Sequence, residues 1–186
     1  MGDGYRITDP EVLKVVAHPL RVRMLGMLRA DGPATASQLA RRVGESSGST
    51  SYHLRELAKY GFIEEDPSTD GRERRWRARH SYTTWDNVQM AATPQGREAL
   101  KIMKLRQVEA LGRAIEEFDE DEWSTEWAEV SGMTDILIKL PPAGLREFFD
   151  RAGALLDELE ERHADDPSTA SAQVFLAGYP RRELEA

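Results

Sequence analysis

The chain has 186 residues, of which 40% are hydrophobic and 31% are charged. This composition is typical of a folded protein of one or two small domains and excludes a disordered chain. The apolar runs are too short to span a bilayer, the N-terminus lacks the pattern of a secretory signal, and there is no cysteine. We therefore expect a cytoplasmic protein with no membrane partner, no disulfide and no thiolate metal site.

The net charge of −8 is distributed unevenly along the chain. Residues 1–80 carry 14 basic and 11 acidic side chains, whereas residues 81–186 carry 11 basic and 22 acidic ones. The front part, at +3, can approach the phosphates of a nucleic acid, and the rear part, at −11, is repelled by them.

Apolar spacing and capping signals predict three helices before residue 45. The first covers residues 10–17, and the second begins at Pro19, since proline is favoured at the first position of a helix. The turn formers at 31–33 end the second helix. The third helix begins with a Thr-x-x-Gln capping box at 35–38 and ends at Gly44.

A fourth helix and a hairpin follow. The helix begins after Ser46, a favourable N-cap, and covers residues 47–60 up to Gly61. Two short strands flank the turn-rich residues 67–71, so we expect a β-hairpin, the wing, within residues 62–80. This order of elements predicts a winged helix-turn-helix, a mainly α fold with small β-sheets (α+β), as a DNA-binding domain over residues 1–90.

The rear part is expected to form a dimerisation domain over residues 91–186. A long helix from about residue 93 to 118 carries apolar residues at the 3,4,3 spacing of a dimer seam, namely Val108, Leu111, Ile115 and Phe118. A strand over 134–140, a helix opened by Pro141 and Pro142, and a strand over 172–179 predict a C-terminal strand–helix–strand unit. A small-molecule effector of this domain is left open.

The fourth helix carries the pattern that points to DNA. At 100° per residue, Thr50, Leu54 and Leu57 share one face, and small, hydroxyl, aromatic and cationic residues share the opposite one. Small residues at the helix start allow close approach to a duplex, free amides there bind phosphate, and an arginine reads guanine. The predicted DNA-binding residues of this helix are Ser47, Gly48, Ser49, Ser51, Tyr52, Arg55 and Lys59.

The hairpin contains five arginines within eight residues, opposed by Glu73. A basic wing beside a recognition helix contacts the backbone or the minor groove. Alternation along the strand places Arg74 with Trp76 on one face, so Trp76 is expected in the core and some arginines are expected in intramolecular pairs. The wing residues predicted to bind DNA are Arg72, Arg74 and Arg75.

Other interpretations fit the same residues. A solvated helix face explains the polar side of residues 47–60, and a winged-helix protein-interaction module without DNA binding is the alternative function. His18 precedes a proline and His53 lies at the edge of the apolar face, so structural roles are expected for both. No phosphate-binding glycine loop, nucleophile elbow or His-Glu-x-x-His pair occurs, so we expect no enzyme, no catalytic residue, no cofactor and no metal.

Residues 13–80 resemble the ArsR-type winged helix-turn-helix transcriptional regulators. The matching motifs are Ala17-His18-Pro19-Leu20-Arg21, Gln38-Leu39-Ala40, Ser51-Tyr52-His53-Leu54-Arg55-Glu56-Leu57 and Tyr60-Gly61-Phe62-Ile63. The resemblance implies a homodimer bound to double-stranded DNA at an inverted-repeat operator, read by residues 47–60. Where the founding metal sensors of the family carry a cysteine pair, this chain has Thr35 and Ser37, so metal sensing is not expected.

Overall fold

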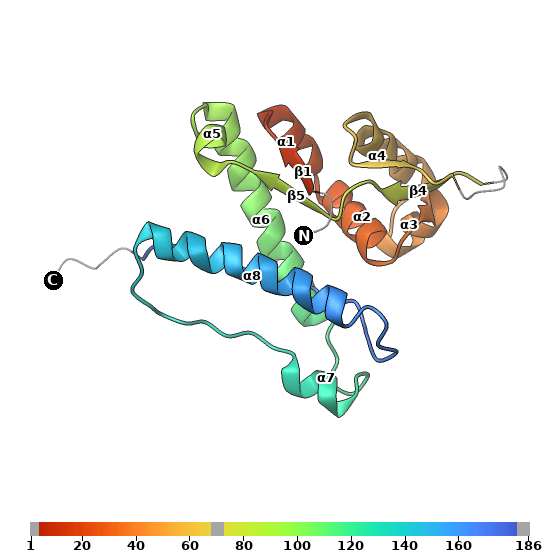
Figure 1. The fold of residues 1–186 in the computed structure, drawn as a ribbon. Coiled ribbons are helices and arrows are strands. Elements are labelled where there is room, and N and C mark those ends of the chain that lie inside the picture. The colour runs from red at the N-terminus through yellow and green to blue at the C-terminus, as the bar shows by residue number, and fades with distance from the viewer. Residues whose placement is uncertain (1–3, 68–72, 182–186) are drawn as a thin grey trace. The chain divides into compact units, whose positions relative to one another are not determined.

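The computed structural model describes residues 4–67 and 73–181. The structure is mainly helical with two small sheets, which confirms the expected α+β class (Figure 1). The chain separates into two compact units, a front unit of residues 2–112 and a rear unit of residues 113–186. The division expected at residue 90 separates a DNA-binding part from a dimerisation part, whereas the two compact units are defined by packing. The assignment of these functions stays a prediction.

Four helices open the front unit. They are α1 (Pro10–Val16), α2 (Pro19–Ala30), α3 (Ala36–Val43) and α4 (Ser47–Lys59). The predicted capping box of α3 is present, because the Gln38 amide donates to Thr35 Oγ1 at 3.2 Å and the Thr35 amide donates to Gln38 Oε1 at 2.8 Å. Gly44 ends α3 in the left-handed region at φ +73°, which glycine adopts without steric cost. The predicted start and end signals of these helices are thus confirmed.

The wing is part of a three-stranded antiparallel sheet. Strands β3 (Ile63–Glu65) and β4 (Arg75–Ala78) form the predicted hairpin, and β4 also pairs with β2 (Ala34–Thr35). The sequence analysis missed β2 because its two residues directly precede a strong capping box. Trp76 is buried beneath the sheet, as predicted.

A second sheet joins the N-terminal end of the front unit to the segment after the wing. Strand β1 (Gly4–Ile7) pairs in parallel with β5 (Tyr82–Trp85), and the short helix α5 (Asn87–Ala91) follows. The sequence analysis predicted none of these three elements. Each is four or five residues long, and the strands acquire their structure only by pairing across nearly eighty residues.

The front unit has one hydrophobic core, to which every helix of this unit contributes. Its members have small side-chain exposure and come from α1 to α6, β1, β3 and β4 together with residues between elements. The core consists of Ile7, Leu13, Val16, Ala17, Met24, Leu25, Leu28, Leu39, Leu54, Leu57, Phe62, Ile63, Trp76, Met90, Ala99, Leu100 and Met103.

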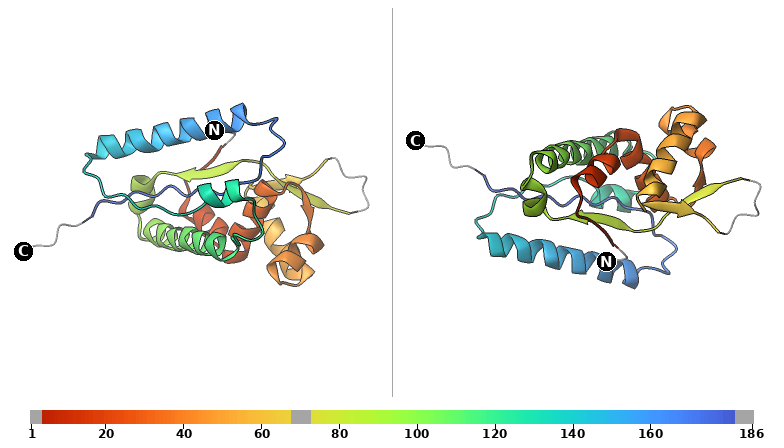
Figure 2. Two further views of the ribbon diagram at one scale, coloured as in Figure 1. Left: turned by 90° about the horizontal axis from the view of Figure 1, so that it is seen from below. Right: turned by 90° about the horizontal axis from the view of Figure 1, so that it is seen from above.

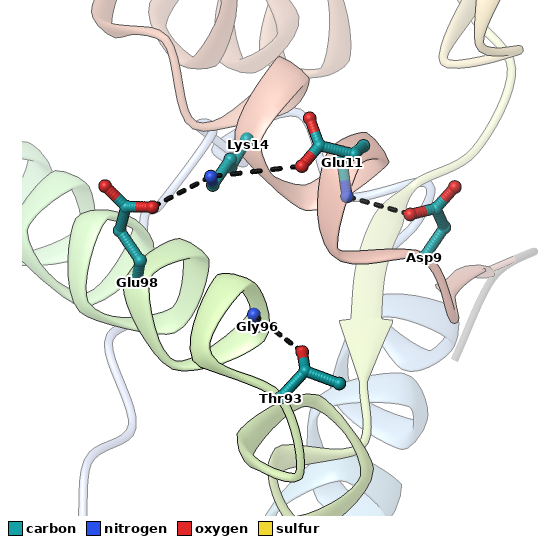
Figure 3. A network of polar contacts seen from close by, with 6 residues as sticks. All are labelled: Asp9, Glu11, Lys14, Thr93, Gly96 and Glu98. Atoms are coloured by element: carbon teal, nitrogen blue, oxygen red, sulfur yellow. Dashed lines mark hydrogen bonds and ion pairs between the residues drawn. The ribbon is translucent and has the colours of Figure 1, made fainter.

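Helix α6 (Pro94–Glu116) confirms the predicted long helix and is fixed to α1 at its start. Thr93 Oγ1 accepts a hydrogen bond from the Gly96 amide at 3.0 Å and so caps the start of the helix. The Lys14 ammonium of α1 lies 2.8 Å from a carboxylate oxygen of Glu98 (Figure 3). This ion pair raises the pKa of Lys14 and lowers the pKa of Glu98.

The rear unit contains α7 (Thr125–Val130) and α8 (Pro142–Arg162), and none of its described residues is buried. Helix α8 was predicted correctly, but the two strands expected at 134–140 and 172–179 were wrong. Figure 2 draws both segments as coil. A strand forms only where another segment receives its backbone hydrogen bonds, and neither segment has such a partner in the described part of the rear unit.

The apolar side chains of these segments consequently stay in contact with solvent. Ile136 is 76% exposed and Leu137 is 78% exposed. The segment around Gly178 lies against α8, where a Cβ atom on this glycine would meet Leu145 Cδ1 at 2.9 Å. Among the described residues, no helix has the length and apolar character needed to cross a membrane.

Candidate nucleic-acid interface

Helix α4 is anchored to the front unit by one face. Ser46 Oγ accepts a hydrogen bond from the Ser49 amide at 3.1 Å, which starts the helix, and Gly61 at φ +75° lets the chain leave it. Thr50, Leu54 and Leu57 have no exposed area, as the helical spacing predicted. The opposite face is thereby fixed toward solvent.

The residues predicted to bind DNA lie where the helical geometry placed them. Ser47, Gly48, Tyr52, Arg55 and Lys59 are exposed, and Ser49 and Ser51 are half-buried. Tyr52 is 56% exposed, and its ring contacts that of His53 edge-on at 5.2 Å between centroids. The structure gives Arg55 no hydrogen bond or ion pair within residues 4–67 and 73–181.

The first turn of α4 presents unoccupied amides. The amides at the first positions of a helix have no intrahelical acceptor, and the Ser46 hydroxyl serves only that of Ser49. A Cβ atom at Gly48 would meet nothing closer than Ser46 Oγ at 3.9 Å, so the surface there is open. The geometry suits a phosphate, because amide hydrogens and the helix dipole both favour an anion at this end.

The arginines of the wing divide between intramolecular contacts and solvent. Arg77 donates two hydrogen bonds to Glu64 at 2.6 and 2.9 Å, and Arg79 lies 3.4 Å from the same carboxylate. Arg74 lies over the Trp76 ring at 5.7 Å and is ion-paired with Glu65 at 3.1 Å. The expected intramolecular pairs are confirmed.

The other two wing arginines predicted to bind DNA are Arg75 and Arg72. Arg75 is half-buried, and its guanidinium donates to the Pro33 carbonyl at 2.5 Å, which ties the wing to the turn after α2. Arg72 lies outside the described residues. Of the three wing arginines predicted to bind DNA, Arg74 therefore has the most accessible described guanidinium.

The sequence analysis missed Arg29, a cation that supports the base of the wing. Arg29 on α2 donates to the His80 carbonyl at 2.9 Å and to Thr83 Oγ1 at 2.8 Å. Burial lowers the pKa of Arg29 to about 10. The sequence of α2 alone does not indicate this role, because both acceptors lie more than fifty residues away in sequence.

The two histidines that were considered separately in the sequence lie against each other. The rings of His18 and His53 have centroids 4.3 Å apart. No group of three or more histidine, aspartate or glutamate residues gathers at metal-binding distance in the described part of the chain.

Comparison with known proteins decides the domain type. Residues 16–66 match a family model described as a helix-turn-helix domain. The front unit therefore contains a winged helix-turn-helix domain. The matched range covers α2, α3, α4 and β3, the first strand of the wing, and ends one residue after β3.

Two solved structures are similar to part of this chain. One is a crystal structure of a "possible transcriptional regulator for arsenical resistance", 28% identical, covering 58% of this chain and 96% of that chain at a TM-score of 0.33. The other is RV1404 from Mycobacterium tuberculosis, 18% identical, covering 61% of this chain and 74% of that chain at a TM-score of 0.31. Because both TM-scores are low, the assignment depends on the family match and on the helix-turn-helix geometry. A comparison with curated proteins gives no match.

Proposed function

We propose that this protein is a homodimeric transcriptional regulator that reads the major groove of DNA with α4. The observation that carries the proposal is the exposed face of that helix, where Arg55 makes no hydrogen bond or ion pair with the described residues and Tyr52 is 56% exposed. Arginine binds the O6 and N7 atoms of guanine with two hydrogen bonds, and the amides at the start of α4 suit a phosphate. Ser47, Gly48, Ser49, Ser51 and Lys59 complete the proposed contact surface.

The wing is proposed to steady the complex through the DNA backbone or the minor groove. Arg72, Arg74 and Arg75 are the proposed wing contacts. Arg74 has half of its side chain in solvent and a weak surface ion pair that phosphate can replace. Phosphate contacts set the register of a protein on DNA without reading its sequence.

The homodimer is proposed to form along α6. Of the seam residues predicted from the sequence, Val108 and Ile115 are 67% and 54% exposed, whereas Phe118 lies beyond the end of α6. Leu105, one turn before Val108 on the same helix, is 51% exposed and joins the proposed seam. Side chains at this spacing form the seam of paired helices, and their burial in a dimer removes apolar area from water. A symmetric dimer reads an inverted repeat whose half-sites are about one helical turn, roughly 10 base pairs, apart.

Selection of genomic DNA fragments by the purified full-length protein tests this proposal. We expect enrichment of fragments that share an inverted repeat, and protection of both half-sites when the bound fragment is footprinted. Retention of all fragments in proportion to their length, or of none, contradicts sequence-specific reading. The protein-interaction module then becomes the better account, since the uncovered apolar residues of the rear unit also suit a protein partner.

A further inference from the structure

The contact between His18 and His53 joins the recognition helix to the junction of α1 and α2. Their ring centroids are 4.3 Å apart, and the planes are inclined by 34°. His18 is the N-cap of α2, and His53 lies on α4 directly after Tyr52, whose ring meets that of His53 edge-on at 5.2 Å. A movement of the His53 ring therefore changes the packing of Tyr52, one of the residues proposed to contact DNA.

The surroundings of both rings favour the neutral form. His18 Nδ1 accepts a hydrogen bond from the Leu20 amide at 3.3 Å, so this nitrogen must carry no proton. His53 Nδ1 is buried and has no hydrogen-bond partner within residues 4–67 and 73–181. An imidazolium at His18 loses the cap of α2, and an imidazolium at His53 buries an N–H without an acceptor.

Charged groups from four parts of the front unit face the pair. Burial lowers the pKa of His18 most, and the neighbouring His53, Arg21 and Arg106 lower it further. Burial also lowers the pKa of His53, with Arg21 acting in the same direction. Glu45 before α4 and Glu56 on α4 oppose this shift at His53 but do not reverse it.

Both arginines near the pair have partners of their own. Arg21 Nε donates to the Val15 carbonyl, and Arg106 of α6 is ion-paired with Glu109 on the same helix. Neither arginine can move away from a new positive charge without losing its own partner. A proton taken up by either ring is therefore destabilising to the contact itself.

We propose that the His18–His53 contact is a proton-sensitive brace of the recognition helix, so that DNA binding weakens when one ring takes up a proton. The inference rests on the proposed function, because its regulatory meaning requires that α4 binds DNA. In the neutral state the contact between the two tilted rings holds α4 against the start of α2. In the singly protonated state the rings separate, the α2 cap is lost or a buried N–H is left unpaired, and Tyr52 loses its support.

The test compares the full-length wild type with the double variant His18→Asn and His53→Phe. Asparagine keeps an acceptor that caps α2, and phenylalanine keeps a ring at position 53, but neither takes up a proton. His163→Gln, a histidine change in the rear unit, is the matched control. Affinity for a selected genomic fragment is measured at pH 7.5 and at pH 5.5, at constant ionic strength.

We expect the wild type and the His163→Gln control to lose about tenfold in affinity at the lower pH, a size common for coupling between two events on one protein. We expect the double variant to keep its affinity. If the wild type binds equally at both pH values, or if the double variant loses as much as the wild type, the brace is overturned while the proposed function stands.

A second measurement on the free protein keeps the two proposals separable. Nuclear magnetic resonance of the histidine rings and hydrogen-exchange protection of the α4 amides are followed over the same pH range. We expect both rings to titrate at a pH below the ordinary histidine range. The protection factors of the α4 amides should fall as the rings take up protons. If no DNA fragment binds at any pH, the proposed function fails. If the protection of the α4 amides stays unchanged while the rings titrate, the brace is overturned, whether or not the protein binds DNA.

Discussion

A Cβ atom at Gly96 would lie 1.8 Å from the carbonyl oxygen of Met90. Gly96 sits in the first turn of α6, and Met90 belongs to the short helix α5 that precedes it. Only a residue without a side chain lets the two helices approach this closely. The contact sets the direction in which α6 leaves the core.

The substitution Gly96→Ala is therefore expected to destabilise the protein. Overpacking of this kind costs about 1–3 kcal/mol, and a backbone oxygen cannot rotate away as a side chain does. Urea unfolding followed by circular dichroism measures the change. Gly112→Ala is the matched control, since its Cβ meets nothing within 4 Å, and we expect it to stabilise α6 by about 0.5–1 kcal/mol.

Arg55→Ala is expected to weaken binding to a selected operator by about 1–3 kcal/mol and to relax the preference at particular base positions. The reason is the loss of a two-bond contact to a base edge. Binding to the operator and to scrambled DNA over a salt series measures both effects. Arg151→Ala in α8, whose side chain is exposed and paired with Glu147, is the control for a lost surface charge.

Arg74→Ala and Arg72→Ala are expected to act differently from Arg55→Ala. A wing contact to phosphate weakens all sequences alike, and each substitution should reduce the salt slope by about one. The same salt series distinguishes the two classes. If Arg74→Ala alters base preference, the wing reads sequence and the proposed division of labour is wrong.

A charge placed on the exposed face of α6 is expected to prevent dimer formation. In the variant Leu105→Glu with Val108→Glu, two carboxylates replace the apolar side chains of the proposed seam, and burying them unpaired is unfavourable. Light scattering at micromolar concentration should give twice the chain mass for the wild type and the chain mass for this variant. Gln107→Glu on the same helix is the control for charge alone. A wild type that is a monomer would falsify the proposed dimer.

The ion pair of Lys14 and Glu98 predicts a pH dependence of stability. The pKa of Glu98 is lowered in the folded state, so its contribution is present above the carboxyl's unfolded pKa and is lost as the pH falls through the folded pKa. The urea midpoint of Glu98→Gln should therefore lie below that of the wild type at neutral pH and coincide with it in acid. Raised salt should narrow the gap at neutral pH, because both side chains reach solvent. Glu116→Gln, at the exposed end of the same helix, should show no such gap.

Local sequence signals predicted those parts of the fold whose cause is local. The capping box at Thr35, the caps at Ser46 and Thr93 and the glycine ends at Gly44 and Gly61 act within four residues, and each is formed. The buried and exposed faces of α4 follow from helical spacing in the same way. The contact surface proposed for DNA was accessible to sequence reasoning for this reason.

Elements that depend on distant partners were missed or wrongly predicted. β1 and β5 are strands because they pair with each other, and the sequence of either one gives no sign of the other. Residues 134–140 have the composition of a strand but no backbone partner in the described rear unit. The same limit applied to the site, where the contact between His18 and His53 arises only when α4 packs beside the start of α2.

The parallel pairing of β1 with β5 also constrains how the protein is made. Gly4 is opposite Tyr82, so β1 has no partner until the helices and the wing that follow it have been synthesised. During translation at about 5–20 residues per second, the helix-turn-helix can pack while its N-terminal strand is still unpaired. A substitution in β1 therefore changes a sheet that cannot close until β5 has been synthesised, whereas all residues of α4 are synthesised before that point.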